Sequence, residues 1–169
     1  MRLFFALWPD ADTKSKLAGV AAKMRLADRS RLVPAENYHL TLAFIGEVPG
    51  SRLPALLKIG ATQRAARLRI SFDATEYWAR SQVVVAAAQK TSAELFALWE
   101  QLHKDLALPE QPNRHAHVTL ARKVAQAPVL QAMSPVTWST NSFGLYRSDT
   151  SGVQAAYTVV DTWPLLDET

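Results

Sequence analysis

Apolar residues recur along the chain with two different periods, and each period predicts a different kind of element. Short apolar runs that end at turn or charged residues predict strands, whereas apolar residues spaced at i, i+3, i+4 and i+7 predict helices. Strands are expected at residues 3–8, 38–48, 67–77, 82–88, 117–122, 136–147 and 153–163. Helices are expected through 17–24, 53–61 and 95–106, and a weaker helical pattern covers 128–133.

Residue types that cap helix N-termini precede the three stronger helical patterns. A Ser, Thr or Asp side chain at this position accepts a hydrogen bond from a backbone N–H of the first turn. The candidate caps are Asp12 or Thr13 for the first helix, Ser51 for the second, and Thr91 or Ser92 for the third.

The order of these elements predicts an α+β fold. Some strands follow one another directly and others alternate with helices, which favours largely antiparallel sheets. No low-complexity linker divides the 169 residues, so we expect one domain spanning 1–169. The two halves also repeat one order, a helix followed by a strand that carries a histidine.

These two strands share a sequence pattern, HLTL at 39–42 and HVTL at 117–120. Side chains alternate between the two faces of a strand, so His39 and Thr41 share one face while the aliphatic residues occupy the other. The same alternation pairs His117 with Thr119. A single His-x-Thr is typical of a structural histidine. Two copies in matching contexts, using two of the four histidines, predict one shared site.

Two imidazoles and two hydroxyls suit a phosphate group. Hydroxyls and protonated imidazoles donate hydrogen bonds to an anionic tetrahedral group, and the charge strengthens those bonds. Two histidines also supply one general acid and one general base, with unperturbed pKa values near ~6.5 and hence an expected activity maximum near neutral pH. The chemistry indicated is in-line displacement at phosphorus, without metal, cofactor or covalent intermediate.

Composition narrows the remaining possibilities. The chain has no cysteine, which excludes disulfides, thiolate nucleophiles and cysteine-based zinc sites and fits a reducing cytoplasm. No apolar stretch approaches the ~20 residues of a membrane span. The net charge is +4. The excess of Lys and Arg lies in residues 1–85, with the segment 23–31 especially basic, and such a half suits a phosphate-bearing partner as well as a solvated surface.

Other histidines and aromatic residues have more ordinary interpretations. His115 forms a His-Ala-His sequence with His117, but no Asp, Glu or Cys lies nearby in sequence to complete a zinc site, so a place at the rim is expected. His103 is expected to be structural or exposed. The remaining aromatic candidates are Trp78, Trp99, Trp138 and Trp163, expected in the core or at the rim, and Phe143 and Tyr146, which could stack on a base.

YHLTLAFIGEV and HVTLAR closely resemble the two signature motifs of the two-histidine phosphoesterase superfamily. Within it, the chain is most similar to the bacterial RNA 2′,3′-cyclic phosphodiesterases, also called 2′-5′ RNA ligases. RLFFALWP and VPAENYHLTLAFIGEV resemble that family's first strand and its approach to the first motif. The resemblance extends over the whole chain. It implies two lobes related by a pseudo-twofold axis, with two largely antiparallel sheets flanked by helices around a central cleft.

The resemblance also implies a role for each residue of the motifs. It makes His39 the proton donor and His117 the proton acceptor, and it gives Thr41 and Thr119 the phosphate oxygens. Arg122 would be a further phosphate contact, and strand parity is expected to place it on the face of His117 and Thr119. One departure is Ala116, where relatives usually have proline before the second histidine. This leaves the approach to the strand less rigid but removes no catalytic group.

The implied function is metal-independent hydrolysis of RNA 2′,3′-cyclic phosphate ends to 2′-phosphomonoesters, with 2′-5′ ligation as the reverse reaction. The protein would be a cytoplasmic monomer that needs no cofactor. Two alternatives remain: the same chemistry on a small nucleotide or an ADP-ribose cyclic phosphate, and a non-catalytic RNA-binding module on the same fold. The intact His39, Thr41, His117 and Thr119 argue against the module, and the basic first half favours RNA over a small nucleotide.

Overall fold

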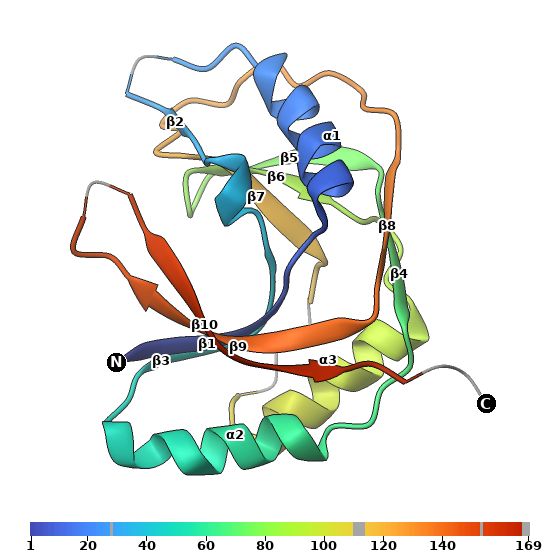
Figure 1. The fold of residues 1–169 in the computed structure, drawn as a ribbon. Coiled ribbons are helices and arrows are strands. Elements are labelled where there is room, and N and C mark those ends of the chain that lie inside the picture. Colours follow the sequence, from blue (N-terminus) through green and yellow to red (C-terminus); the bar gives the residue numbers. More distant parts are fainter. Residues whose placement is uncertain (28, 110–113, 153, 167–169) are drawn as a thin grey trace.

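The computed structural model describes residues 1–27, 29–109, 114–152 and 154–166 (Figure 1). The helices are α1 (Ala11–Ala22), α2 (Leu53–Thr62) and α3 (Ala93–Asp105), with short 3₁₀ turns at Ala35–Asn37 and Gly50–Arg52. The strands are β1 (Arg2–Leu7), β2 (Arg31–Leu32), β3 (Leu40–Glu47), β4 (Leu68–Phe72), β5 (Ala74–Trp78), β6 (Val83–Ala87), β7 (His117–Arg122), β8 (Val136–Thr140), β9 (Ser142–Asp149) and β10 (Ala156–Pro164).

The strands form two four-stranded sheets and one two-stranded ladder. Their orders are β10-β9-β1-β3, β2-β7-β6-β5 and β4-β8, and every pairing between these strands is antiparallel. Figure 1 shows the β4-β8 ladder linking the two larger sheets along one side of the molecule. The predicted α+β class with antiparallel sheets is therefore confirmed.

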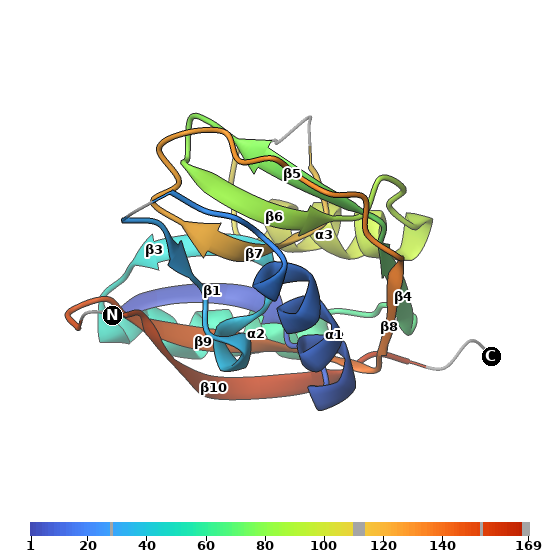
Figure 2. The same cartoon turned by 90° about the horizontal axis from the view of Figure 1, so that it is seen from above.

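The two halves of the chain exchange their helices. Helix α1, from the first half, contacts β7 and β8, whereas α3, from the second half, contacts β3. Buried residues of both helices, such as Leu17 and Leu102, therefore share one core cluster with Leu40 and Val118 on the two histidine-bearing strands. This exchange holds β3 and β7 next to each other, as Figures 1 and 2 show.

Two predicted strands are each divided in the structure. The run at 67–77 becomes β4 and β5, which pair with different strands, because Asp73 turns the chain between them. The N–H of Asp73 donates to the carbonyl of Ala87 at 3.0 Å, and the carboxylate of Asp73 accepts the N–H of Gln89 at 3.0 Å. The run at 136–147 becomes β8 and β9, separated at Asn141. The last predicted strand begins at Ala156, and position 153 lies outside the described residues.

The helical pattern at 128–133 is wrong, and two of the predicted caps are also wrong. Residues 128–133 form no helix, and the backbone carbonyl of Gln131 accepts the hydroxyl of Thr75 instead. The cap of α1 is Asp10, which accepts the N–H of Thr13 at 2.7 Å. Helix α2 follows a 3₁₀ turn that contains Ser51, so that residue does not cap it. Ser92 caps α3 as expected.

The longest helix in the described ranges is α3, with 13 residues. None of the helices in this part of the chain has the length and apolar composition that crossing a membrane requires.

Candidate active site

Burial along β3 and β7 follows the predicted alternation. His39, which immediately precedes the first residue of β3, and Thr41 are half-buried, while Leu40 and Leu42 are buried. On β7, His117 and Thr119 are likewise half-buried between buried aliphatic neighbours. Each strand thus uses its aliphatic face for the core and presents an imidazole and a hydroxyl on the other face.

Each of the two strands also carries a β-bulge immediately after its threonine. On β3, Thr41 pairs with Ala6 and Ala43 with Phe5, so Leu42 has no partner. On β7, Thr119 pairs with Val85 and Ala121 with Val84, so Leu120 has none. The two bulges occupy equivalent positions in HLTLAF and HVTLAR, and the repeat between the halves therefore extends beyond the His-x-Thr pattern.

The bulges decide which way the residue at the end of each motif points. The expectation that strand parity alone places Arg122 on the His117 face is wrong, because Arg122 lies three positions after Thr119 and strict alternation would turn it away. A bulge places an extra residue on one side of the strand and re-aims the next one. Leu120 and Ala121 are accordingly both buried. Arg122 lines a cavity of about 320 Å³ together with His39 and Thr41, so the expected place of Arg122 beside the site is reached through the bulge.

The bulge on β3 places Phe44 in the same cavity. Its ring is 49% exposed, and the guanidinium of Arg2 lies over it at 4.7 Å from the ring centre. Phe44 is the counterpart of Arg122 in the repeat, and the expected strand alternation gave no reason to place it at the site.

The carbonyl groups of the two bulge residues, Leu42 and Leu120, find hydrogen-bond partners outside the paired strands. The carbonyl of Leu42 lies 3.2 Å from Nε2 of His103, which projects from α3. The carbonyl of Leu120 accepts the N–H of Val33 at 2.8 Å. His103 is only 5% exposed, so its structural interpretation is confirmed and the exposed alternative is wrong. A buried carbonyl without such a donor would be costly.

The two histidines are oriented by the same hydrogen bond. Nδ1 of His39 lies 2.7 Å from the carbonyl oxygen of Asn37, and Nδ1 of His117 lies 2.6 Å from that of His115. A carbonyl oxygen can only accept, so Nδ1 carries a hydrogen in each ring. In the neutral imidazole, Nε2 therefore has the free lone pair, and in the protonated form Nε2 has the proton that can be donated.

His39 lies within an aromatic cluster. The ring of Trp8 stacks on it at 5.1 Å between centres and 8° between planes. Phe4 and Tyr157 complete the cluster at 5.1 and 4.9 Å. The pKa of His39 is lowered to about 4, chiefly by burial and also by the positive charges of Arg122 and His117, against the opposing effect of the hydrogen bond to Asn37. A protonated His39 is thus a stronger acid than a free imidazolium.

His117 has a more polar environment. The Trp78 ring lies edge-on at 4.4 Å, and its Nε1 donates to Glu76 at 2.9 Å. The other oxygen of Glu76 lies 3.4 Å from Nε2 of His115. Burial lowers the pKa of His117, whereas the hydrogen bond to His115 and the carboxylate of Glu76 act in the opposite direction. Sequence reasoning missed Glu76, which is distant along the chain and reaches the site only because β5 pairs with β6 beside β7.

The expectation of unperturbed histidine pKa values is wrong for the substrate-free protein. Both values fall below 6.5, because both rings are removed from water and lie near the charge of Arg122. Glu76 favours a proton on His117, and His39 has no carboxylate among the groups that shift its pKa. An anion bound between the rings would raise both values by stabilising the protonated forms.

The predicted residues are brought together to different degrees. His39, Thr41 and Arg122 line one cavity. His117 lies close enough for its charge to lower the pKa of His39, and Thr119 lies on the same face of β7.

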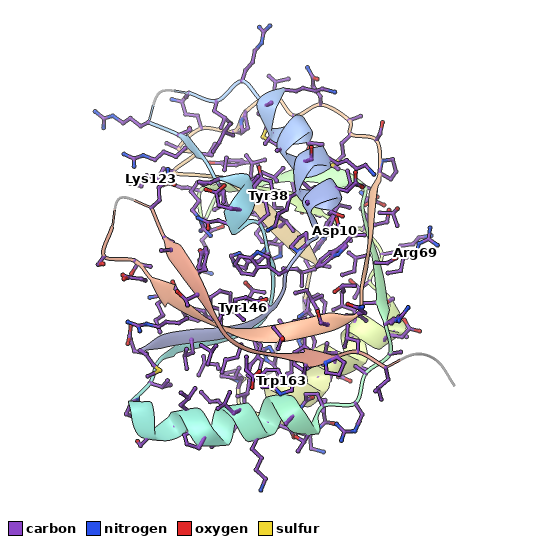
Figure 3. The ribbon with its side chains drawn as sticks, viewed as in Figure 1. Asp10, Tyr38, Arg69, Lys123, Tyr146 and Trp163 are labelled. Atoms are coloured by element: carbon purple, nitrogen blue, oxygen red, sulfur yellow. The ribbon has the colours of Figure 1, made fainter. Side chains whose placement is uncertain are left out.

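Phe143 is 2% exposed in the core and cannot stack on a base. Tyr146, labelled in Figure 3, is also buried, and its ring packs on that of Trp8 at 4.5 Å between centres. Trp99 and Trp138 are buried, and Trp163 packs against the core, as expected.

A metal site is not indicated among the residues that the structure describes. No group of three or more His, Asp or Glu side chains gathers there in a way that could hold a metal ion. His115 is paired with Glu76 at the rim.

Comparisons with known proteins agree on one family. The model of the family described as LigT like Phosphoesterase matches residues 7–85. RNA 2′,3′-cyclic phosphodiesterase of Escherichia coli strain K12 is 31% identical over 170 residues, covering 97% of this chain and 96% of the relative. The enzyme of the same name from Thermus thermophilus is 32% identical over 184 residues, covering 99% and 92%.

Solved structures give the same result. The crystal structure of E. coli LigT complexed with 3′-AMP superimposes with a TM-score of 0.85 at 29% identity, over 97% of each chain. A crystal structure of a T. thermophilus protein superimposes with a TM-score of 0.82 at 28% identity, over 100% of both chains. These likenesses cover both sheets and both histidine-bearing strands.

Proposed function

The chain belongs to the family of LigT-like phosphoesterases, and we propose that it hydrolyses RNA 2′,3′-cyclic phosphate ends to 2′-phosphomonoesters. The observation that carries the proposal is the pair of imidazoles held through Nδ1 by equivalent carbonyl groups. Both rings are oriented in the same way, with Nε2 left for the reaction. The relatives named above carry the same activity in their names.

The reaction is a single in-line displacement. Water attacks phosphorus while Nε2 of His117 takes its proton, and the bond from phosphorus to the 3′ oxygen breaks as His39 delivers a proton to that oxygen. The product is a 2′-phosphomonoester with a free 3′ hydroxyl. The carboxylate of Glu76 stabilises the imidazolium that forms on His117, and the low pKa of His39 makes it an effective donor.

The hydroxyls and Arg122 stabilise the charge on phosphorus. Thr41 and Thr119 donate to the non-bridging oxygens, and the guanidinium neutralises the additional negative charge of the transition state. Phe44 offers the terminal base an exposed ring inside the cavity, and base–aromatic stacking is tolerant of sequence.

The same site supports 2′-5′ ligation. A 5′ hydroxyl in place of water would attack the cyclic phosphate of a second RNA end while His117 takes its proton and His39 protonates the departing 3′ oxygen, which gives a 2′-5′ linkage. Every group proposed for hydrolysis or ligation comes from one chain, so a monomer suffices. The absence of cysteine fits action in a reducing cytoplasm.

A second candidate substrate is a small cyclic nucleotide. The cavity of about 320 Å³ is large enough for one nucleotide, at the lower end of ligand-pocket volumes of roughly 300–1,000 Å³. The chemistry would be unchanged.

We predict that hydrolysis of a short RNA ending in a 2′,3′-cyclic phosphate survives EDTA undiminished, because the two imidazoles move both protons. The assay follows conversion to the 2′-phosphomonoester by chromatography, with adenosine 2′,3′-cyclic phosphate measured in parallel. Loss of activity on chelation that added zinc or magnesium restores would contradict the mechanism. Turnover of the mononucleotide but not the RNA would favour the second candidate.

A further inference from the structure

A second cavity adjoins the one that contains His39. It has a volume of about 120 Å³, and its lining includes Arg31, Asn37 and Lys123. Arg122, Ala155 and Tyr157 line both cavities, so the two are direct neighbours. A volume of this size is well below that of pockets for whole small molecules, roughly 300–1,000 Å³. It suits a single group of a larger substrate rather than another base.

Two arginine side chains of this cavity lie where their charges repel each other. Arg31 on β2 is directly opposite Arg122 on β7 in the antiparallel register, and directly opposed residues share one face of a sheet. Like charges in this position destabilise the sheet. Neither arginine forms an ion pair with any residue in the described ranges that could offset the repulsion. An anionic ligand placed between the two guanidinium groups would offset this repulsion.

Lys123 adds a third positive charge at the same edge. Its φ is 58°, in the left-handed region that a lysine adopts at a cost. The neighbouring backbone holds it there, with the N–H of Val124 donating to the carbonyl of Gln82 at 2.9 Å. Backbone strain of this kind gathers at ligand-binding sites. In Figure 3, Lys123 lies beside the hairpin of β9 and β10.

The opposite wall of the cavity is tied to the catalytic strand. The side chain of Asn37 donates to the carbonyl of Ala155 at 2.9 Å, and the backbone carbonyl of Asn37 holds Nδ1 of His39. One residue therefore orients the proposed acid and fixes the hairpin end that both cavities share. A group bound in the second cavity is thereby placed in a defined position relative to the reacting phosphate.

We propose that the second cavity binds the phosphate on the 5′ side of the terminal RNA nucleotide, through Arg31 and Lys123, while the terminal cyclic phosphate lies between His39 and His117. This inference rests on the proposed function and extends it to a preference for a polynucleotide end. Arg31 and Arg122 both line the second cavity, and Arg122 also lines the first, so the two side chains can contact consecutive phosphates. The recognition is electrostatic and independent of base sequence.

The test compares three substrates that differ only on the 5′ side. They are adenosine 2′,3′-cyclic phosphate, the same compound with a 5′-phosphate, and the ApA dinucleotide ending in the cyclic phosphate. The wild-type kcat/KM is expected to be about 10-fold higher for the second and third than for the first, as for a charge-assisted phosphate contact. Added salt should diminish this preference.

Arg31→Ala is the decisive variant. The preference for the two longer substrates should fall to near unity, and the melting temperature should not decrease, because a like-charge repulsion is removed. Arg69→Ala is the matched control. Arg69 is exposed on β4, on the opposite side of the molecule from Lys123 (Figure 3), and its loss should leave the preference as in the wild type.

The remaining outcomes separate the two proposals. Hydrolysis of all three substrates at equal kcat/KM would overturn the second cavity as a phosphate site and leave the proposed function intact. A higher kcat/KM for ApA that the 5′-phosphate alone does not reproduce would assign the increase to the additional nucleoside. That result would also overturn the second cavity as a phosphate site. Failure to hydrolyse any of the three would contradict the proposed function itself.

Discussion

Replacing either His39 or His117 with alanine is expected to lower turnover of a cyclic-phosphate RNA end by about 100-fold or more, on the scale of general acid–base catalysis. The expectation follows from the position of Nε2 in each ring, because a backbone carbonyl holds each Nδ1 and Nε2 is the nitrogen left to give or take a proton. Both variants should remain folded, since the buried faces of β3 and β7 are their aliphatic faces.

Folding of these variants is checked by circular dichroism and thermal melting. His115→Ala is the matched control, because it removes an imidazole beside His117 and keeps the backbone carbonyl that orients the His117 ring. It should alter the pH dependence of the reaction without a loss of the size seen for His39 or His117. A folded His39→Ala or His117→Ala protein with near-normal turnover would refute the assignment.

Arg122→Gln is expected to lower kcat by roughly 100- to 1,000-fold, as removal of a preorganised donor to a developing anion does. It should also raise the apparent pKa values of both histidines, because the guanidinium charge lowers both in the intact protein. Arg122→Lys should recover only part of the rate, since an ammonium cannot make the two parallel hydrogen bonds of a guanidinium.

The measurement for Arg122 is the rate as a function of pH for each variant, with Arg69→Gln as a control for loss of surface charge. A decrease in rate without any movement of the pH dependence would mean that Arg122 acts only on the substrate. An unchanged kcat would remove it from the site.

Much of the candidate site was predictable because it depends on local rules. Alternation on a strand needs only the sequence, and it placed His39 with Thr41 and His117 with Thr119 on faces opposite to their aliphatic neighbours. The family resemblance supplied the fold and the place of Arg122. The antiparallel α+β class likewise followed from the order of the apolar runs.

The features that were missed depend on contacts between distant segments. The bulges at Leu42 and Leu120 arise in the pairing with β1 and β6 and are supported by His103 and Val33, which no local pattern indicates. Phe44 reaches the cavity only through such a bulge. The division of 67–77 into two strands has the same origin, because β4 and β5 belong to different sheets.

The electrostatics of the two histidines could not be predicted from sequence for a related reason. A free imidazole titrates near ~6.5, but the Trp8 ring stacked on His39 and the carboxylate of Glu76 near His117 give the rings different environments. The two rings therefore differ in acidity although the two strands have almost the same sequence, and in the substrate-free protein Glu76 favours a proton on His117 rather than on His39.

The most direct test of the two-histidine mechanism is the pH dependence of kcat/KM and kcat for the wild-type protein, from about pH 4 to about pH 9, on a cyclic-phosphate RNA end. The reactive form holds one proton on the pair, so both profiles should be bell-shaped. The maximum of kcat/KM, which reports the free protein, should lie below pH 6.5, because burial lowers both pKa values. The maximum of kcat should lie at higher pH, because the bound phosphate anion raises them. A profile that is flat, or that has a single limb, would contradict a mechanism in which two imidazoles share one proton.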